Sequence, residues 1–188
     1  ITKPFTFEGR RRASIADKAI EQVKQYADTL LIVPNQKLLD VIDDKVSMID
    51  GFDMINEVLN QSVKGVSDII TRTGHINVDF ADVREVMRDR GLAVMGTGRA
   101  SGSDRARKAA LSAISSPLIE SKSIEGAQAV LLNISGSSSL SLHEIRDAAS
   151  IIYDQADPEA NIILGSVIDD SLNDEIMVTI IATGFSEH

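Results

Sequence analysis

Cysteine and tryptophan are both absent from this sequence of 188 residues, and aromatic residues make up only 4% of it. The missing cysteines exclude disulfide bonds and thiolate metal sites. No apolar run approaches the roughly 18 residues of a membrane-spanning helix, so we expect a cytoplasmic chain without direct membrane insertion. Acidic residues outnumber basic ones by 28 to 19, which argues against nucleic acid or an anionic membrane surface as the main partner.

The composition that remains is an ordinary globular one, with 43% apolar and 25% charged residues. The sequence opens with Ile1 rather than Met, inside residues 1–7 that have the character of a β-strand, so we expect a piece of a longer protein. Apolar residues at helical spacing follow over residues 10–27, and then comes the short apolar run Leu30–Val33. Strand, helix and strand in this order are typical of the end of a parallel α/β sheet.

A longer helix is predicted over residues 46–72, where apolar residues recur at three- and four-residue steps. Its other faces are apolar too, so we expect a spine buried between two layers. The fold class is therefore α/β: the tail of a Rossmann-like sheet, a long central helix, and a C-terminal α/β domain with a mixed four-stranded sheet. The last two strands are expected to form a hairpin through residues 169–174. The expected parts are 1–45 (end of the first domain), 46–72 (spine helix), 73–83 (acidic loop) and 84–188 (C-terminal domain).

Two acids, Asp79 and Asp82, stand three residues apart at the start of a predicted helix, shortly after Asn77. Asp79 is a good N-cap, and an acid three residues later favours a helix N-terminus, so capping is the better interpretation of the spacing alone. A helix start needs only one cap, however. An acid presented beside the phosphate of a neighbouring molecule would be placed to orient or activate a water.

Three other motifs allow two interpretations each. Gly96–Gly102 is glycine-rich before a predicted helix and has the look of a phosphate cradle, but a plain turn is the stronger interpretation. Glu8–Arg12 carries three successive cations and is either a solvated helix face or an anion-facing turn. Asn35 is either a turn residue or a ligand contact at the carboxyl end of a strand. No group of residues has metal-ligand spacing.

Five segments follow one another in order along the chain: Thr2–Arg12, Ile32–Asn35, Asn77–Val83, Ala113–Leu118 and Thr179–Phe185. Together they resemble the FtsZ family, the bacterial tubulin-like GTPases of cell division. The resemblance runs along the whole chain and departs from the family in one large respect: no glycine-rich run of the type GGGTGTG occurs here.

The resemblance implies roles for eight residues. Asn77, Asp79 and Asp82 would form a loop that reaches the nucleotide of the next subunit, with the acids polarising the attacking water and Asn77 positioning the loop. Glu8 would contact the ribose, Arg12 the ribose and phosphate region, and Asn35 the nucleoside. Phe52 would stack on guanine and Asn56, one helical turn later, would bond the base edge. Asn56 departs from the Asp of many relatives, although its amide can still donate and accept.

By the same resemblance the chain is part of a GTP hydrolase that polymerises head to tail with itself at the division site. GTP or GDP would be the nucleotide, with Mg²⁺ able to accompany it. In the family, division adaptors dock on a C-terminal tail, for which we expect no counterpart after His188. Because the phosphate loop is missing from the sequence, we expect the isolated chain to be inactive. The alternative is a non-catalytic assembly module that caps a filament end.

Overall fold

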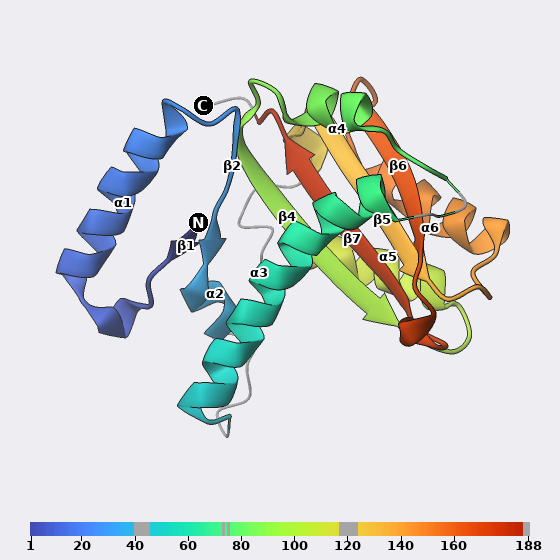
Figure 1. Cartoon of the computed structure of the whole chain (residues 1–188), viewed down its shortest axis with the longest axis horizontal. Helices are drawn as coiled ribbons and strands as arrows, with labels where there is room; N and C mark the ends of the chain where they lie inside the picture. The colour runs from blue at the N-terminus through green and yellow to red at the C-terminus, as the bar shows by residue number, and fades with distance from the viewer. Residues whose placement is uncertain (40–45, 73, 75, 117–123, 186–188) are drawn as a thin grey trace.

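The structure is a computed structural model that describes residues 1–39, 46–72, 74, 76–116 and 124–185. A mixed five-stranded sheet in the order β2-β4-β7-β5-β6 forms the centre, and β1 and β3 form a small parallel sheet beside it (Figure 1). The strands are β1 Thr2–Lys3, β2 Thr29–Leu31, β3 Val33–Pro34, β4 Gly91–Ala100, β5 Ala129–Gly136, β6 Asn161–Ile168 and β7 Ile176–Thr183. The α-helices are α1 Arg10–Lys24, α2 Asn35–Leu39, α3 Met48–Thr71, α4 Phe80–Met87, α5 Arg105–Ile114 and α6 Leu142–Gln155.

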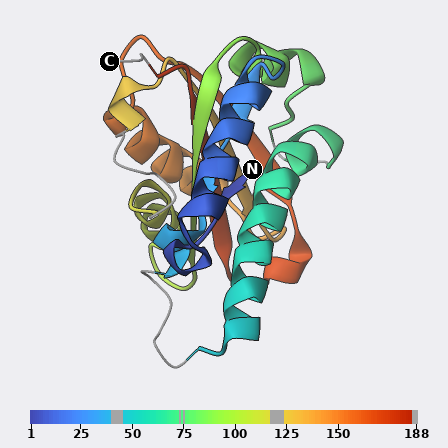
Figure 2. The ribbon, with the colours of Figure 1, turned by 90° about the vertical axis from the view of Figure 1, so that its left-hand side faces the viewer.

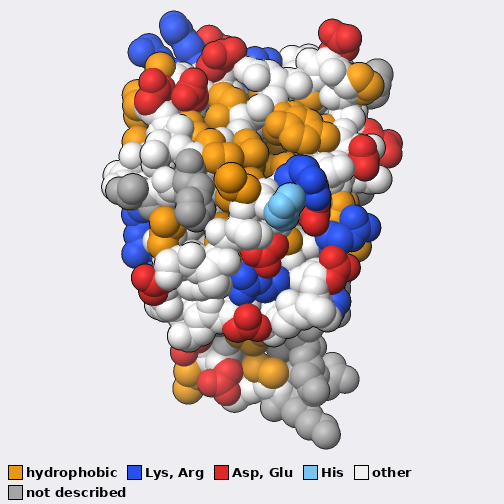
Figure 3. Space-filling model, turned by 90° about the vertical axis from the view of Figure 1, so that its right-hand side faces the viewer, with side chains coloured by type: hydrophobic (Ala, Val, Ile, Leu, Met, Phe, Trp, Pro, Cys, Tyr) orange, Lys and Arg blue, Asp and Glu red, His pale blue; other side chains and the backbone are white. Residues whose placement is uncertain are grey.

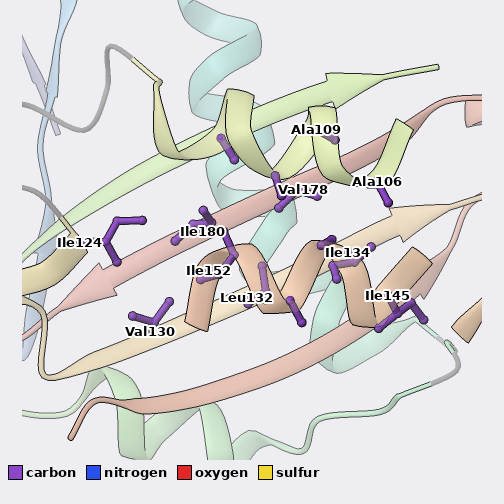
Figure 4. Close-up of a cluster of buried hydrophobic side chains, with 14 of the residues drawn as sticks. Ala106, Ala109, Ile124, Val130, Leu132, Ile134, Ile145, Ile152, Val178 and Ile180 are labelled. Atoms are coloured by element: carbon purple, nitrogen blue, oxygen red, sulfur yellow. The ribbon is translucent and has the colours of Figure 1, made fainter. Parts of the chain in front are cut away.

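Helices cover the central sheet on both faces. Figure 4 shows α5 and α6 against one face, where alanines of α5 and isoleucines of α6 meet the strands. The other face packs on α3 and α4. Strand β5 lies between them and is buried along its whole length; Val130 and Leu132 point to the first face and Leu131 to the second. This explains the apolar run Ala129–Leu132 at the start of β5, because a strand covered on both faces needs no polar alternation.

The long helix α3 connects the two sheets. Ile55, in its N-terminal half, lies in one buried cluster with Phe5 and Leu38, whereas Ile69 near its other end packs against Gly165 of β6. Both views show the N-terminal end of α3 projecting beyond the central sheet (Figure 1, Figure 2). The helix is thus a spine, but its burial was overestimated: Met48 and Val63 are exposed. Only the face that meets these clusters is covered by the described residues.

The N-terminal segment differs from the prediction in its strands. The opening strand is only β1, because residues 6–8 turn into a short 3-10 helix. The run Leu30–Val33 is divided at Ile32: β3 pairs with β1, while β2 pairs in parallel with β4. The central sheet therefore has five strands rather than four. The α/β fold class is confirmed, and the division into domains remains a prediction.

Two further expectations were wrong. The last two strands do not form a hairpin, because β5 lies between β6 and β7 in the sheet. The motif Gly96–Gly102 lies mostly in a strand rather than a turn, since β4 continues to Ala100 and pairs with β7 from Ala93 to Ala100; the turn before α5 starts only at Gly102. A Cβ on Gly98 would lie 2.1 Å from the carbonyl oxygen of Ala109. The glycine is there so that α5 can approach the strand closely.

Candidate functional site

Asp79 and Asp82 form a reciprocal capping box at the start of α4. Asp79 Oδ1 accepts the backbone N–H of Asp82 at 2.9 Å, and Asp82 Oδ2 accepts the backbone N–H of Asp79 at 3.3 Å. Both acids are therefore used as caps, contrary to the expectation that one would be left over. Each bond engages one carboxylate oxygen, and both side chains are exposed. The pair can stabilise the helix and still present a second oxygen from each acid to solvent.

The loop before α4 is folded on itself and on the sheet. Asn77 is exposed, and its Oδ1 accepts the backbone N–H of Gly74 at 3.1 Å, which closes a short turn. Ile76 exchanges two hydrogen bonds with Ser166 of β6, at 2.7 and 2.9 Å. Val78 is buried in the core. The acids therefore follow three consecutive residues, Ile76, Asn77 and Val78, that are each held in place. Residues 73 and 75 of the predicted loop lie outside the described residues.

An ion pair ties the end of α3 to the end of β6. Arg72 Nη1 lies 3.0 Å from Asp169 Oδ2 and 3.5 Å from Asp68 Oδ2. The hydrogen bond to Asp169 raises the pKa of Arg72. The pKa of Asp169 is lowered, first by the hydrogen bond from Ser171 and then by the one from Arg72. The ends of α3 and β6 that flank the acidic loop are thus joined to each other.

Two of the predicted nucleotide residues, Glu8 and Arg12, are paired. Glu8 Oε1 lies 3.0 Å from Arg12 Nη1, and Glu8 Oε2 accepts the backbone N–H of Phe5 at 2.8 Å. Glu8 therefore belongs to the turn that starts α1, as a capping residue of the 3-10 helix. The Arg12 side chain is mostly exposed. The run Glu8–Arg12 is thus both a helix start and a source of solvent-facing positive charge.

Phe52 and Asn56 share the exposed N-terminal half of α3. The Phe52 ring meets Phe5 edge-on at 5.6 Å, and Phe5 stacks on Phe7 at 4.8 Å. Sequence reasoning missed this aromatic group; the Phe5-Thr6-Phe7 pattern was assigned to a strand. A short strand followed by a 3-10 turn puts both rings near α3 instead.

Asn35 begins α2 directly after β3 and is buried. Within the described residues its Oδ1 has no hydrogen-bond partner. A buried acceptor without a partner is unusual in a folded protein. The neighbouring Gln36 is engaged with Thr6, whose backbone N–H and hydroxyl both donate to its side-chain oxygen. Asn35 therefore lies beside the turn that carries Glu8, with an unused acceptor.

The two groups lie at opposite ends of α3. Residues 52 to 71 alone span about 28 Å of helix axis at roughly 1.5 Å per residue, and Asp79 follows beyond that end. The structure thus brings Glu8, Arg12, Asn35 and Phe52 to one region and Asp79 and Asp82 to another. A single small ligand cannot contact both groups of one chain.

A separate cavity of about 810 Å³ lies between α3, α4 and the sheet. Its lining includes Val63 and Val66 of α3 and Val83 and Met87 of α4. None of the eight predicted site residues lines it. It is therefore distinct from the two groups described above.

The model of the FtsZ family C-terminal domain matches residues 91–186. An empty FtsZ dimer of M. jannaschii is 38% identical over 97% of this chain, with a TM-score of 0.92. The chain belongs to the FtsZ family. A mutant FtsZ of M. jannaschii gives the same identity and TM-score over 98% of the chain. The present chain spans only 53% and 55% of these two FtsZ chains, about half their length.

More distant tubulin-like proteins share the fold. GDP-bound CetZ1 of Haloferax volcanii is 18% identical, with a TM-score of 0.79 over 99% of this chain and 54% of its own. TubZ of Bacillus thuringiensis, seen as GDP-form protofilaments, is 12% identical with a TM-score of 0.72, over 100% of this chain and 52% of its own. In the residues that the structure describes, no helix is long and apolar enough to cross a membrane.

Proposed function

We propose that this chain is the C-terminal part of a self-polymerising, tubulin-like GTPase that forms the cytokinetic ring in bacterial cell division. Asp79 and Asp82 act on GTP bound by the next subunit of a head-to-tail filament, at the division site in the cytoplasm. The observation that carries the proposal is the separation of the two groups along α3. A loop so far from the nucleotide residues of its own chain reaches a nucleotide only on another molecule.

The acids suit the chemistry of phosphoryl transfer to water. Such reactions need little covalent chemistry from the protein and depend on positioning and electrostatics. Asp79 and Asp82 each keep a carboxylate oxygen outside the capping box, and a carboxylate oxygen accepts a hydrogen bond from water and orients it. Asn77 holds the preceding turn through Gly74.

The opposite end of α3 supports the nucleotide part of the proposal. Phe52 presents an exposed ring for stacking on guanine, and Asn56 presents an amide on the same helix. The unpaired Oδ1 of Asn35 accepts a donor of the nucleoside. Glu8 and Arg12 complete the group at the ribose and phosphate side.

Mg²⁺, when it accompanies the nucleotide, neutralises phosphate charge. The described residues contain no group of three or more His, Asp or Glu side chains placed to hold a metal ion. The donor set of the described residues therefore does not fit a metal site of its own, and the ion would be held by the phosphates.

The face that carries the acidic loop suits contact with another subunit. Figure 3 shows hydrophobic side chains gathered in the upper part of this face, with charged side chains around and below them. Phe80 of α4 is exposed, and Ile162 and Leu164 of the edge strand β6 are half-buried. Exposed apolar surface bordered by polar groups is typical of protein interfaces.

A filament-capping module is the second candidate. The chain presents an acidic loop at one end but contains no glycine-rich phosphate run for the other. It would occupy the nucleotide end of a filament without offering a complete nucleotide site to the next subunit. Growth from that end would then stop.

The test uses M. jannaschii FtsZ in which the residues aligned with Asp79 and Asp82 are both alanine. Loaded with GTP and mixed with this chain, it should regain phosphate release that saturates with chain concentration. A chain carrying Asp79→Asn and Asp82→Asn should give a saturating rate lower by about 100-fold or more. Absence of phosphate release with the unmodified chain, although the two proteins bind each other, would assign the chain to capping alone.

A matched control removes one acid near the far end of the same helix. Asp89 is exposed and has a left-handed backbone, with φ of 54°, which Asn tolerates well. Asp89→Asn therefore removes one negative charge without disturbing the fold. It should leave the rescued rate unchanged, which separates the acid pair from a general effect of negative charge.

A further inference from the structure

Ser166 makes the closest ties between the central sheet and the segment that leads to the acids. It lies on the edge strand β6, which pairs with β5 on one side and meets this segment on the other. Ser166 is only 2% exposed. Its hydroxyl accepts the N–H of Ile76 at 2.7 Å, and its own N–H donates to the carbonyl oxygen of Ile76 at 2.9 Å. One serine thus engages both backbone groups of Ile76, three residues before Asp79.

Two glycines allow this close contact. A Cβ on Gly74 would lie 1.5 Å from the carbonyl oxygen of Ser166, so no other residue fits there without moving the segment away from β6. A Cβ on Gly165 would lie 2.4 Å from Ile69 and 3.0 Å from Val78. The segment is therefore seated on β6 at a distance that only glycine permits.

We infer that Ser166 is a positioning residue for the acid pair: through Ile76 it fixes where Asp79 and Asp82 stand relative to the sheet. This inference rests on the proposed function. The ion pair of Arg72 with Asp169 provides a second tie between the same two segments. Ser166 itself does not contact the nucleotide or the water, so its effect passes through the placement of the loop.

The hydroxyl is the group that can be removed alone. Ser166→Ala keeps the backbone bond to the Ile76 carbonyl but leaves the Ile76 N–H without its acceptor, and an unsatisfied donor favours displacement of the segment. A misplacement of about 1 Å at a catalytic group can cost on the order of 100-fold in rate. We expect Ser166→Ala to lower the saturating rate of rescued GTP hydrolysis by roughly tenfold or more, with the half-saturating chain concentration unchanged.

The experiment compares four variants with the unmodified chain in the rescue assay with acid-less M. jannaschii FtsZ. Ser166→Ala and Gly74→Ala should both lower the saturating rate. Ser166→Thr, which retains the hydroxyl, should keep the rate of the unmodified chain. The control is Ser135→Ala on the neighbouring strand β5; this serine is also buried and its hydroxyl accepts one hydrogen bond, from Asn133 at 3.3 Å. It should match the unmodified chain. Thermal unfolding of every variant should show the same folded fraction.

Each outcome decides a different statement. Equal saturating rates for Ser166→Ala and the unmodified chain would overturn the positioning role and leave the proposed function standing. An equal loss in Ser135→Ala would show that the effect follows stability, which also overturns it. Failure of the unmodified chain to restore any hydrolysis would overturn the proposed function and this inference together. A raised half-saturating concentration at an unchanged rate would assign Ser166 to subunit contact instead.

Discussion

Asp79 and Asp82 each cap the backbone N–H of the other, with bonds of 2.9 and 3.3 Å at the first turn of α4. The arrangement uses one oxygen of each carboxylate and leaves one of each at the surface. A structural role and a catalytic role therefore do not compete for the same atoms. Substitutions that keep the cap while removing the charge should separate the two roles.

Replacement of either acid by Asn tests this separation. Asn caps helices about as well as Asp, so Asp79→Asn should change the free energy of unfolding by less than about 0.5 kcal/mol, whereas Asp79→Ala should cost about 1 kcal/mol. Both should lower the rescued GTP hydrolysis by about 100-fold. Urea denaturation and phosphate release provide the two measurements. The Asn and Ala variants of Asp82 complete a set of four. A loss of activity in proportion to the loss of stability across these four variants would assign the acids to folding alone.

Nucleotide binding by the isolated chain should be weak. Affinity for GTP depends largely on groups that cradle the phosphates, and this chain contains no glycine-rich run for them. Isothermal titration should show no micromolar binding of GTP; a micromolar Kd would contradict the prediction that the chain cannot hold GTP tightly without a glycine-rich phosphate run. Guanosine binding, detected by chemical shift changes, should weaken in Phe52→Ala. It should persist in Met48→Ala, which truncates another exposed apolar side chain of α3.

The Arg105–Glu144 pair should make the fold sensitive to acid. Arg105 is nearly buried and lies 2.6 Å from Glu144, and this hydrogen bond is the first cause of the lowered pKa of Glu144, followed by the bonds from Ser141. A carboxyl whose pKa is lowered by folding stabilises the fold above its ordinary pKa and loses that contribution as the pH falls through the lowered value. The free energy of unfolding should therefore decline below about pH 4.5.

Glu144→Gln should cost about 2 kcal/mol at neutral pH, since it leaves Arg105 with a weaker partner. The loss should shrink at acid pH, below the lowered pKa of Glu144, where the Glu144 carboxyl of the unmodified chain is itself protonated. Asp147→Asn is the matched control, because the Asp147 pair with Arg146 is exposed on the same helix. Urea denaturation at the two pH values measures both. A cost for Glu144→Gln that is independent of pH would contradict the ionic origin.

Gly98→Ala tests why the glycine-rich motif of β4 exists. The added Cβ would lie 2.1 Å from the Ala109 carbonyl oxygen and 2.5 Å from the Ala113 nitrogen, which belong to the backbone of α5 and cannot rotate away. We expect a loss of about 2–3 kcal/mol in the free energy of unfolding. Gly51→Ala, in open space on α3, should instead gain about 0.5–1 kcal/mol. A neutral Gly98→Ala would remove the packing explanation.

Local patterns predicted the long helix most accurately. Its expected range, residues 46–72, agrees with α3 within two residues at each end, because hydrophobic periodicity and caps are local signals. The capping interpretation of Asp79 and Asp82 was also visible in their spacing. What the spacing could not show is that both acids cap at once, since that depends on the orientation of each carboxylate.

The errors concern contacts between distant segments. The hairpin between β6 and β7 was inferred from a short connection, but connection length does not reveal that β5 lies between them. The glycines of β4 were read as a loop because glycine disfavours strands, whereas the reason for Gly98 is a helix backbone ten or more residues away in sequence. The role of Ser166 could not be predicted for the same reason, because its partner Ile76 lies in a distant segment of the sequence.

The most direct test of an acid pair that works on another molecule locates the nucleotide relative to this chain. The chain is labelled with ¹⁵N and mixed with acid-less M. jannaschii FtsZ that carries a slowly hydrolysed GTP analogue and paramagnetic Mn²⁺. The amides of Asp79 and Asp82 should broaden strongly, while those of Phe52 and Asn56, at the other end of α3, should stay sharp. Broadening at Phe52 and Asn56 with sharp signals at Asp79 and Asp82 would contradict the proposed function.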